Sequence, residues 1–354
     1  MNNQPFFNRR ILLLTVLIMV SVFTLLLPAH AQEAETEDLI TRIDTILNDL
    51  VEQETFSGAV LVGRGDDILL NEGYGMANIE WDVPNTPDSK FNVASITKQF
   101  TAAAILMLQE QGKLNLEDPI CNYLEDCPDA WNAITIEQVL THRDGIPELF
   151  NAPDPLESQA ISPERLIALF RDKTLDFEPG KGQGYANSGY IVLGQVIETV
   201  SDQSYGQFLQ ENILQPLEME NTDYDNPDQV IKHRVTGYVN SNKVVEFVDP
   251  SILYAAGGLY STTGDLFKWV RALFNGKVVS PETVETSLNN GYGLAVDVFG
   301  GRPVVAQNGY FPGFTSALRY FPDDDVTLIV LSNFEAVPID QVVASIFNQL
   351  FGDD

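Results

Sequence analysis

The chain is poor in cysteine, histidine and positive charge. Its 354 residues include 2 Cys and 3 His, too few for a disulfide scaffold or a four-cysteine zinc site. Only 20 Lys and Arg stand against 50 Asp and Glu, which gives a formal net charge of −30. Nucleic acids and anionic membrane surfaces would repel a protein with this field, so we expect neither as a partner.

Several chemistry-bearing motifs are also missing. The sequence has no G-x-S-x-G nucleophile elbow, no H-E-x-x-H zinc motif and neither of the common glycine-rich phosphate-binding motifs. These absences argue against an α/β-hydrolase and leave nucleotide chemistry unsupported. With so few histidines, a metal site would need mostly carboxylates. The apolar content of 44% is nevertheless that of a globular protein with a sizeable core.

The N-terminus reads as an export signal. Arg9-Arg10 is followed by an uncharged apolar run over residues 11–27, and Ala29-His30-Ala31 precedes Gln32. A positive start, an apolar middle and an A-x-A site predict a signal peptide over residues 1–31. The alternative is an uncleaved membrane anchor, because the run is only just shorter than a membrane span. Cleavage would leave a single domain over residues 32–354, exported to the periplasm or the extracellular space, with no stable membrane span.

The two cysteines are close in the sequence. Cys121 and Cys127 are separated by five residues in the segment CNYLEDC. An oxidising compartment would allow them to form a small-loop disulfide. The alternative is a pair of free thiols.

Strand patterns occur at both ends of the chain, and helical patterns in the middle. After a helix over residues 38–53, strands are predicted over residues 58–62 and 68–74. Four more follow over residues 294–299, 304–307, 315–321 and 326–331, before a last helix over 341–351. Helical periodicity marks residues 96–111, 135–140, 163–170, 189–200 and 205–214.

This order predicts an α+β fold of the α/β-sandwich type. One antiparallel sheet would be built from the N- and C-terminal segments, with flanking helices and an inserted helical region. We expect a sheet subdomain over about residues 38–90 and 255–354, and a helical subdomain over about residues 91–254. The sequence gives no indication of oligomeric state.

A candidate nucleophile opens the first central helix. In Ser95-Ile96-Thr97-Lys98, the spacing of three would place Ser95 and Lys98 on one helix face. A Lys in a water-poor pocket can act as the base that a Ser needs, and a helix N-terminus offers N–H groups to an oxyanion. By itself the Ser-x-x-Lys pattern is weak evidence for catalysis, because a Ser N-cap followed one turn later by a surface Lys gives the same sequence pattern.

Two later segments carry compatible groups. Tyr185 could relay a proton, and Asn187, two residues on, could hold a substrate carbonyl. Gln307-Asn308-Gly309 is expected to end the strand over residues 304–307, where a glycine would let the substrate backbone approach closely.

Taken together, these segments resemble the serine β-lactamase and penicillin-binding-protein superfamily, in its class C, D-Ala-D-Ala carboxypeptidase and esterase branch. The similar segments occur in the family's order and extend over about residues 38–350. They are VASITKQFTAAAILMLQEQGKL (93–114), VLTHRDGIPEL (139–149), EPGKGQGYANSGYIVLGQVIE (178–198), PLEMENT (216–222), AAGGLYSTTGDL (255–266), YGLAVDV (292–298) and NGYFPGFTS (308–316). The resemblance implies a β-lactamase/transpeptidase-like fold.

The resemblance also implies roles. Ser95 would be the acylated nucleophile, with Lys98 and Tyr185 sharing its proton and delivering it to the leaving group. Asn187 would hold a substrate amide, and the N–H groups of Ser95 and Tyr310 would form the oxyanion hole. Asn308 and Gly309 would line the substrate site with Gln307. No cofactor or metal is implied, and the substrate would be a small molecule or peptide.

The third motif departs from the family pattern. The family usually has Lys-Thr-Gly or His-x-Gly where this chain has Gln307-Asn308-Gly309. A neutral Gln cannot give a charge-assisted hydrogen bond to a substrate carboxylate. We therefore expect uncharged esters or amides to lose least, and β-lactams and D-Ala peptides to lose most. The alternative to a serine hydrolase is a catalytically inactive ligand-binding or sensor protein with the same pocket.

Three further polar residues are expected to be structural. His142 lies in a segment similar to the family's LLTHTSGL and would pack or fix a loop. His233 is expected on the surface. Asp265, after Ser-Thr-Thr-Gly, is expected to be a helix N-cap.

Overall fold

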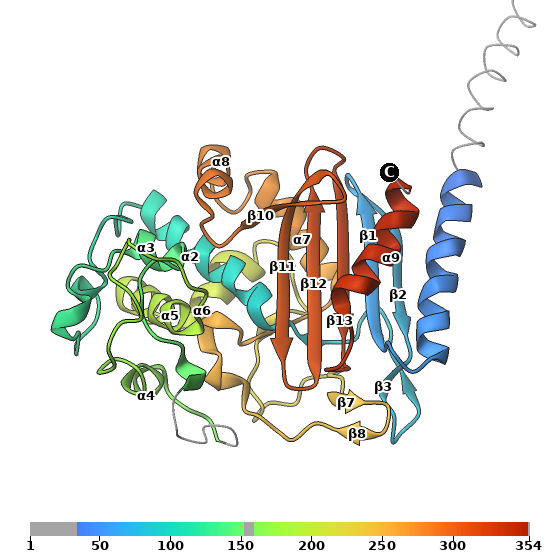
Figure 1. The fold of residues 1–354 in the computed structure, drawn as a ribbon, viewed down its shortest axis with the longest axis horizontal. Coiled ribbons are helices and arrows are strands. Elements are labelled where there is room, and N and C mark those ends of the chain that lie inside the picture. Colours follow the sequence, from blue (N-terminus) through green and yellow to red (C-terminus); the bar gives the residue numbers. More distant parts are fainter. Residues whose placement is uncertain (1–33, 152–158, 353–354) are drawn as a thin grey trace, which may run out of the picture.

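The computed structural model describes residues 34–151 and 159–352. The predicted signal peptide over residues 1–31 lies outside the described residues. The predicted α+β class is confirmed: a six-stranded antiparallel sheet stands beside a helical region (Figure 1). The exact division into a sheet subdomain and a helical subdomain stays a prediction.

The large sheet joins the two ends of the described chain. Its strand order is β10-β11-β12-β13-β1-β2, so the last strand in the sequence pairs with the first. Each neighbouring pair is antiparallel. The strands are β1 (Gly58–Arg64), β2 (Asp67–Tyr74), β10 (Ala295–Phe299), β11 (Arg302–Phe311), β12 (Phe314–Phe321) and β13 (Val326–Ser332).

Burial along the strands follows their place in the sheet. Every residue of β13 is buried, as are six of the seven residues of β1. These central strands are almost wholly apolar because both of their faces are covered. The edge strand β10 is exposed at four of its five residues. One face packs against the helix over residues 34–52 and against α9 (Ile339–Phe351); α7 (Thr263–Phe274) contacts β13 and β1.

The helical region has its own apolar centre, which is continuous with the other face of the sheet. Its main elements, α2 (Thr97–Glu110) and α5 (Asn187–Ser201), pack against each other. The other helices are α3 (Ile136–Leu140), α4 (Pro163–Ala168), α6 (Tyr205–Leu209) with its π-helical continuation Gln210–Leu214, and α8 (Pro281–Asn290).

Two sequence-based expectations about strand and helix ends were wrong. Ser95 does not lie in the long helix: it lies in the 3-10 turn Ala94–Ile96, and α2 begins at Thr97. The strand predicted to end at Gln307 continues through Asn308 and Gly309 to Phe311. Glycine lowers strand propensity, but the pairing of β11 with β12 overrides it.

A small sheet connects the two parts of the fold. Its strands are β5 (Phe91–Asn92), β9 (Leu259–Ser261) and β6 (Asp223–Tyr224), in that order. Because β5 is followed by Val93 and the turn that carries Ser95, the position of this sheet helps to place the site. Among the other short strands, β3 (Met76–Asn78) pairs with β4 (Val83–Pro84), and β7 (Tyr238–Asn240) with β8 (Lys243–Val244).

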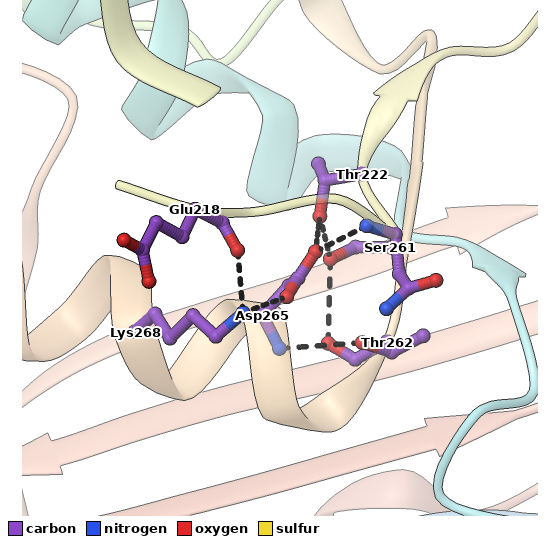
Figure 2. A network of polar contacts seen from close by, with 7 residues as sticks. Glu218, Thr222, Ser261, Thr262, Asp265 and Lys268 are labelled. Atoms are coloured by element: carbon purple, nitrogen blue, oxygen red, sulfur yellow. Dashed lines mark hydrogen bonds and ion pairs between the residues drawn. The ribbon is translucent and has the colours of Figure 1, made fainter. Parts of the chain in front are cut away.

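A polar network fixes this sheet to α7 (Figure 2). The N-cap of α7 is Thr262, whose hydroxyl accepts from the Asp265 N–H, so the expectation that Asp265 is the cap was wrong. The Asp265 carboxylate instead accepts from Asn221 N at 2.8 Å, Thr222 Oγ1 at 3.0 Å and Lys268 Nζ at 2.9 Å. It therefore ties the loop before β6 to the start of α7.

The structure joins Cys121 and Cys127 by a disulfide, with Cα atoms 5.3 Å apart. The bond closes a short loop on the helical side, and both residues pack against the main core. Within residues 34–151 and 159–352, none of the helices is both long and apolar enough to cross a membrane.

Candidate active site

Ser95 lies in a tight turn between the small sheet and α2. The preceding residue, Ala94, has a positive φ of 46°, a conformation that is unfavourable for alanine and that is enriched at functional sites. The Asn92 side chain stabilises it by accepting from Ala94 N at 2.9 Å. As the middle residue of a 3-10 turn, Ser95 has an N–H group without an acceptor inside that turn.

Lys98 is buried beneath this turn, with 2% of its surface exposed. Its Nζ lies 3.1 Å from Ser95 Oγ, 2.8 Å from Asn187 Oδ1 and 2.8 Å from the Ala256 carbonyl oxygen. Burial lowers the pKa of Lys98 to about 7, although the charge of Glu148 opposes the shift. A large fraction of Lys98 is therefore neutral at neutral pH.

Tyr185 meets Ser95 from the other side. Its hydroxyl donates to Ser95 Oγ at 2.7 Å. The residue as a whole is 56% exposed, but its hydroxyl points into the site. Burial of the hydroxyl raises the pKa of Tyr185 to about 12; the hydrogen bond with Ser95 opposes this shift, and the charge of Glu148 adds to it. Tyr185 is thus a neutral phenol at physiological pH.

His142 packs against the Tyr185 ring, at 4.6 Å between ring centroids, and against Tyr190, at 5.1 Å. Its Nδ1 accepts from the Ala186 N–H at 3.5 Å, and its carbonyl oxygen accepts from Gly184 N at 2.9 Å. Burial and the nearby Lys98 lower the pKa of His142 to about 4, so it is neutral. These contacts agree with a loop-fixing role, and His233 is exposed, as expected.

Asn187, at the start of α5, is held by a residue that the sequence analysis missed. The Glu148 carboxylate accepts from Asn187 N at 2.7 Å and from its Nδ2 at 3.3 Å. With its amide nitrogen on Glu148, Asn187 must present Oδ1 to Lys98. A lone carboxylate in the otherwise apolar segment Ile146 to Leu149 was the available sequence signal.

Strand β11 forms the opposite wall. Gln307, Asn308 and Gly309 pair with Leu318, Ala317 and Ser316 of β12. A Cβ on Gly309 would lie 2.3 Å from Ser316 Oγ and 2.4 Å from the Val93 carbonyl oxygen. The glycine therefore allows the strand to contact the backbone beside Ser95. The expectation that it also leaves room for the substrate backbone stays a prediction.

The pairing pattern also orients Tyr310. Phe311 and Phe314 close a two-residue hairpin, so they form a hydrogen-bonded pair and Tyr310 and Thr315 form a non-hydrogen-bonded pair. The Tyr310 N–H then points away from β12. On that side β10 pairs only as far as Ala306, so within the described part of the chain no strand covers this N–H. The expected oxyanion donor faces an open strand edge.

A buried guanidinium lies behind this wall. Arg319 Nη1 donates to the carbonyl oxygens of Gln307 and Leu318 at 3.3 and 3.0 Å. Its Nη2 donates to Asn308 Oδ1 at 2.7 Å and to Asp340 Oδ1 at 2.9 Å. Since four of the five N–H donors of Arg319 have protein partners, and its charge is paired with Asp340, it holds the strand rather than facing the cleft.

Two cavities meet at these residues. One of about 760 Å³ is lined by Ser95, Asn187, Gly309 and Tyr310, and the other, of about 470 Å³, by Lys98. Tyr185 and Gln307 line both. The structure thus brings the candidate nucleophile Ser95, its two hydrogen-bonding partners and the third-motif strand to one cleft. Across residues 34–151 and 159–352, His, Cys, Asp and Glu form no cluster of three or more suited to a metal.

A six-stranded antiparallel sheet, an adjacent helical region and Ser-x-x-Lys at their junction define the β-lactamase and penicillin-binding-protein class of fold. The family model described as Beta-lactamase matches residues 43–343. The chain belongs to this family of serine hydrolases.

Individual relatives agree with this assignment. The chain is 31% identical to penicillin-binding protein 4* of Bacillus subtilis (strain 168), over 83% of this chain and 71% of the relative. Its structure matches a penicillin-binding protein from Bacillus halodurans with a TM-score of 0.77 and 28% identity, covering 86% of this chain and 99% of the other. D-amino acid amidase from Ochrobactrum anthropi SV3 shares the fold, with a TM-score of 0.79 and 24% identity over 88% and 99% of the chains.

Proposed function

We propose that the chain is an exported serine hydrolase that forms an acyl-enzyme on Ser95. Its substrate would be a small ester, amide, D-amino-acid peptide or β-lactam. The observation that carries the proposal is the convergence of Lys98 Nζ and the Tyr185 hydroxyl on Ser95 Oγ, at 3.1 and 2.7 Å. A buried amine with a pKa of about 7 is typical of functional sites, and it is not required where a Ser and a Lys serve only as a helix cap and a surface residue.

The hydrogen bonds around Lys98 favour it as the base. A neutral amine has two N–H donors and one lone pair. Two acceptors that cannot themselves donate, Asn187 Oδ1 and the Ala256 carbonyl oxygen, each lie 2.8 Å from Nζ. If both donors go to them, the lone pair faces Ser95 Oγ and can take its proton during attack on the substrate carbonyl.

Tyr185 is suited to the return of the proton. With a pKa raised to about 12 it remains protonated, so it can give a proton to the leaving group and recover one from Lys98. Lys98 Nζ lies 4.9 Å from the centre of the Tyr185 ring. A water molecule would then attack the acyl-enzyme by the same groups in reverse order, releasing the acid and restoring Ser95.

The N–H groups of Ser95 and Tyr310 would hold the oxyanion. Ser95 lies in a turn held in a strained conformation by Ala94, and Tyr310 lies on the uncovered edge of β11. Preorganised backbone donors of this kind stabilise a tetrahedral intermediate by roughly 3 kcal/mol each.

Active-site labelling tests the proposal. A fluorophosphonate should label the wild-type protein at one site, and Ser95→Ala should abolish labelling. The matched control is Ser241→Ala, which removes a partly exposed serine that is distant in the sequence. Pre-steady-state bursts with p-nitrophenyl acetate, nitrocefin and a D-Ala-D-Ala peptide would then rank the substrate types.

The non-catalytic alternative makes the opposite prediction. Its only support is the neutral Gln307 in place of a basic residue. A ligand-binding protein with this pocket would bind one of these compounds without a burst, and labelling would not depend on Ser95.

A further inference from the structure

The cleft is divided into two chemically different halves. We define the apolar half as the 760 Å³ cavity and the polar half as the 470 Å³ cavity. Tyr185 and Gln307 line both, so they form the boundary between them. A substrate that reaches Ser95 across this boundary would have one part in each half.

The placement of the reactive groups decides which part lies where. Ser95 and the oxyanion strand residues Gly309 and Tyr310 line only the apolar half, whereas Lys98 lines only the polar half. The carbonyl carbon must contact Ser95 with its oxygen toward Tyr310, so the acyl group lies in the apolar half. The leaving group must approach Tyr185, which lines both halves, and it lies on the side of Lys98, which lines only the polar half, so it extends into the polar half.

The apolar half is formed by side chains without charge. Phe150, Val248, Ile252 and Leu253 come from the helical region and the loop after β8, and Phe311 and Ile339 from β11 and the start of α9. Among the described residues that line it, none is acidic or basic. A carboxylate or an ammonium placed there would lose its hydration without an ion partner.

The polar half combines apolar lining residues with uncharged hydrogen-bonding groups, which make up a larger share of its lining than in the apolar half. Thr141, Gln183, Asn289 and Asn290 line the polar half, and its ionisable residues among those described are Lys98, His142, Tyr185 and Tyr190. His142 is kept neutral by burial, and Lys98 is occupied with Ser95. The charge of Arg319 is paired with Asp340 behind β11. None of the described residues that line the polar half is therefore a free cation for a carboxylate.

We propose that the substrates are neutral esters or amides with an apolar acyl group, such as an arylacetyl group. Their leaving group would be an uncharged amine or alcohol that carries amide or hydroxyl groups. This rests on the proposed function. In the reaction, the Ser95 Oγ–acyl bond forms as the acyl–leaving-group bond breaks, and the Ser95 proton goes to the leaving group. Water then cleaves the acyl-enzyme into a carboxylic acid and free Ser95.

Binding to an inactive variant tests the substrate class without catalysis. Ser95→Ala would be titrated by calorimetry with phenylacetyl-glycinamide, acetyl-glycinamide and phenylacetyl-glycine. We expect the first to bind at least tenfold more tightly than each of the others, because a buried phenyl group is favourable and the free carboxylate finds no cation. Equal binding of all three would overturn the proposal, whether or not Ser95 is the nucleophile.

Kinetics on the wild-type protein supply the second readout. With p-nitrophenol as a constant leaving group, kcat/KM should be at least tenfold higher for the phenylacetate ester than for the acetate, and lower for the hemisuccinate than for the acetate. Fluorophosphonate labelling with no acyl preference would overturn the substrate class and leave the proposed function intact. Absence of labelling, with the expected binding order, would overturn the proposed function and support the two-sided cleft.

Two variants localise the effect to each half. Phe150→Ala should lower kcat/KM for the phenylacetate ester about fivefold more than it lowers kcat/KM for the acetate ester. Asn290→Lys should raise the affinity of the Ser95→Ala protein for phenylacetyl-glycine about fivefold, whereas Asn242→Lys, an exposed position on the β7–β8 turn, should not. An equal gain from both lysines would mean a general charge effect and would contradict the assignment of the polar half.

Discussion

The two walls of the cleft are held in different ways. On the helical wall, Lys98 is buried and makes three short contacts that fix its Nζ beside Ser95. On the strand wall, Gln307 is partly exposed and its amide nitrogen bonds only to the neighbouring Asn308 carbonyl oxygen, at 2.8 Å. The buried contacts of Lys98 leave little freedom for substitution on the helical wall. A substitution of Gln307 on the strand wall can change the substrate preference of the protein with little effect on its stability.

The largest expected effect lies on the helical wall. Lys98→Met keeps much of the side-chain volume and removes the amine, so the acylation rate should fall by about 10³-fold or more, because the candidate base is lost. Lys113→Met, an exposed lysine beyond the end of α2, is the control and should leave the rate unchanged. Burst kinetics and fluorophosphonate labelling rates measure the acylation rate. A loss of less than tenfold in Lys98→Met would show that Lys98 is not the base.

The pH dependence should come from the same residue. The pKa of Lys98 is about 7, and the base works only when deprotonated. We therefore expect kcat/KM for a neutral ester to fall about tenfold per pH unit below pH 6 and to level off above pH 8. Tyr185, with a pKa of about 12, should cause no decline below pH 10. A flat profile between pH 5 and 9, after subtraction of the Ser95→Ala rate, would contradict this.

A substitution on the strand wall should change selectivity rather than rate. Gln307→Lys places an ammonium at the boundary of the two cavities. It should raise turnover of carboxylate-bearing substrates about tenfold and that of neutral esters less than twofold, because charge-assisted hydrogen bonds favour only the former. Gln307→Met is the uncharged control. Equal effects on both substrate types would show that Gln307 does not set the preference.

The smallest expected effect tests how the walls are connected. Glu148→Gln can still accept one hydrogen bond from Asn187, but it allows the Asn187 amide to rotate and present nitrogen to Lys98. We expect Glu148→Gln to lower kcat about fivefold and to change KM little. Glu148→Asp, which keeps the carboxylate, should retain a kcat close to that of the wild type. The midpoint of the kcat/KM pH profile should also shift to lower pH, because the charge of Glu148 raises the Lys98 pKa and Gln removes that charge. An unchanged kcat and midpoint would assign Glu148 to packing alone.

The sequence was most informative where a pattern repeats locally. The strands at both ends and the helices between them were predicted from spacing. The candidate residues Ser95, Lys98 and Tyr185 were predicted from motif and resemblance; the structure brings them together, and their catalytic roles stay a prediction. The 3-10 turn at Ser95 was missed because it depends on the positive φ of Ala94 and on support from the small sheet. Neither is visible in a helical repeat.

The missed contacts are those that join distant segments. Glu148 and Asn187 are 39 residues apart in the chain, and Arg319 and Asp340 are 21 apart, so no local pattern connects either pair. A basic residue within the apolar strand Ala317 to Phe321 was nevertheless a signal for a buried charge with a partner. The cap of α7 was misassigned because Thr262 and Asp265 are both good cap residues, and only the fold shows which one is used.

The pairing of the first and last strands determines when the site can form. Ser95 and Lys98 are made early in synthesis, but the strand that completes their cleft, β11, comes about 200 residues later, and β13 must pair with β1 to place it. Such long-range pairing slows folding, because the chain loses the entropy of closing a long loop before the stabilising contacts between the strands form. A chain that lacks its last 60 residues would contain the proposed nucleophile and base without the strand that carries the proposed oxyanion donor Tyr310. Recovery of activity during refolding would therefore report the final closure of the large sheet rather than the formation of the helical region.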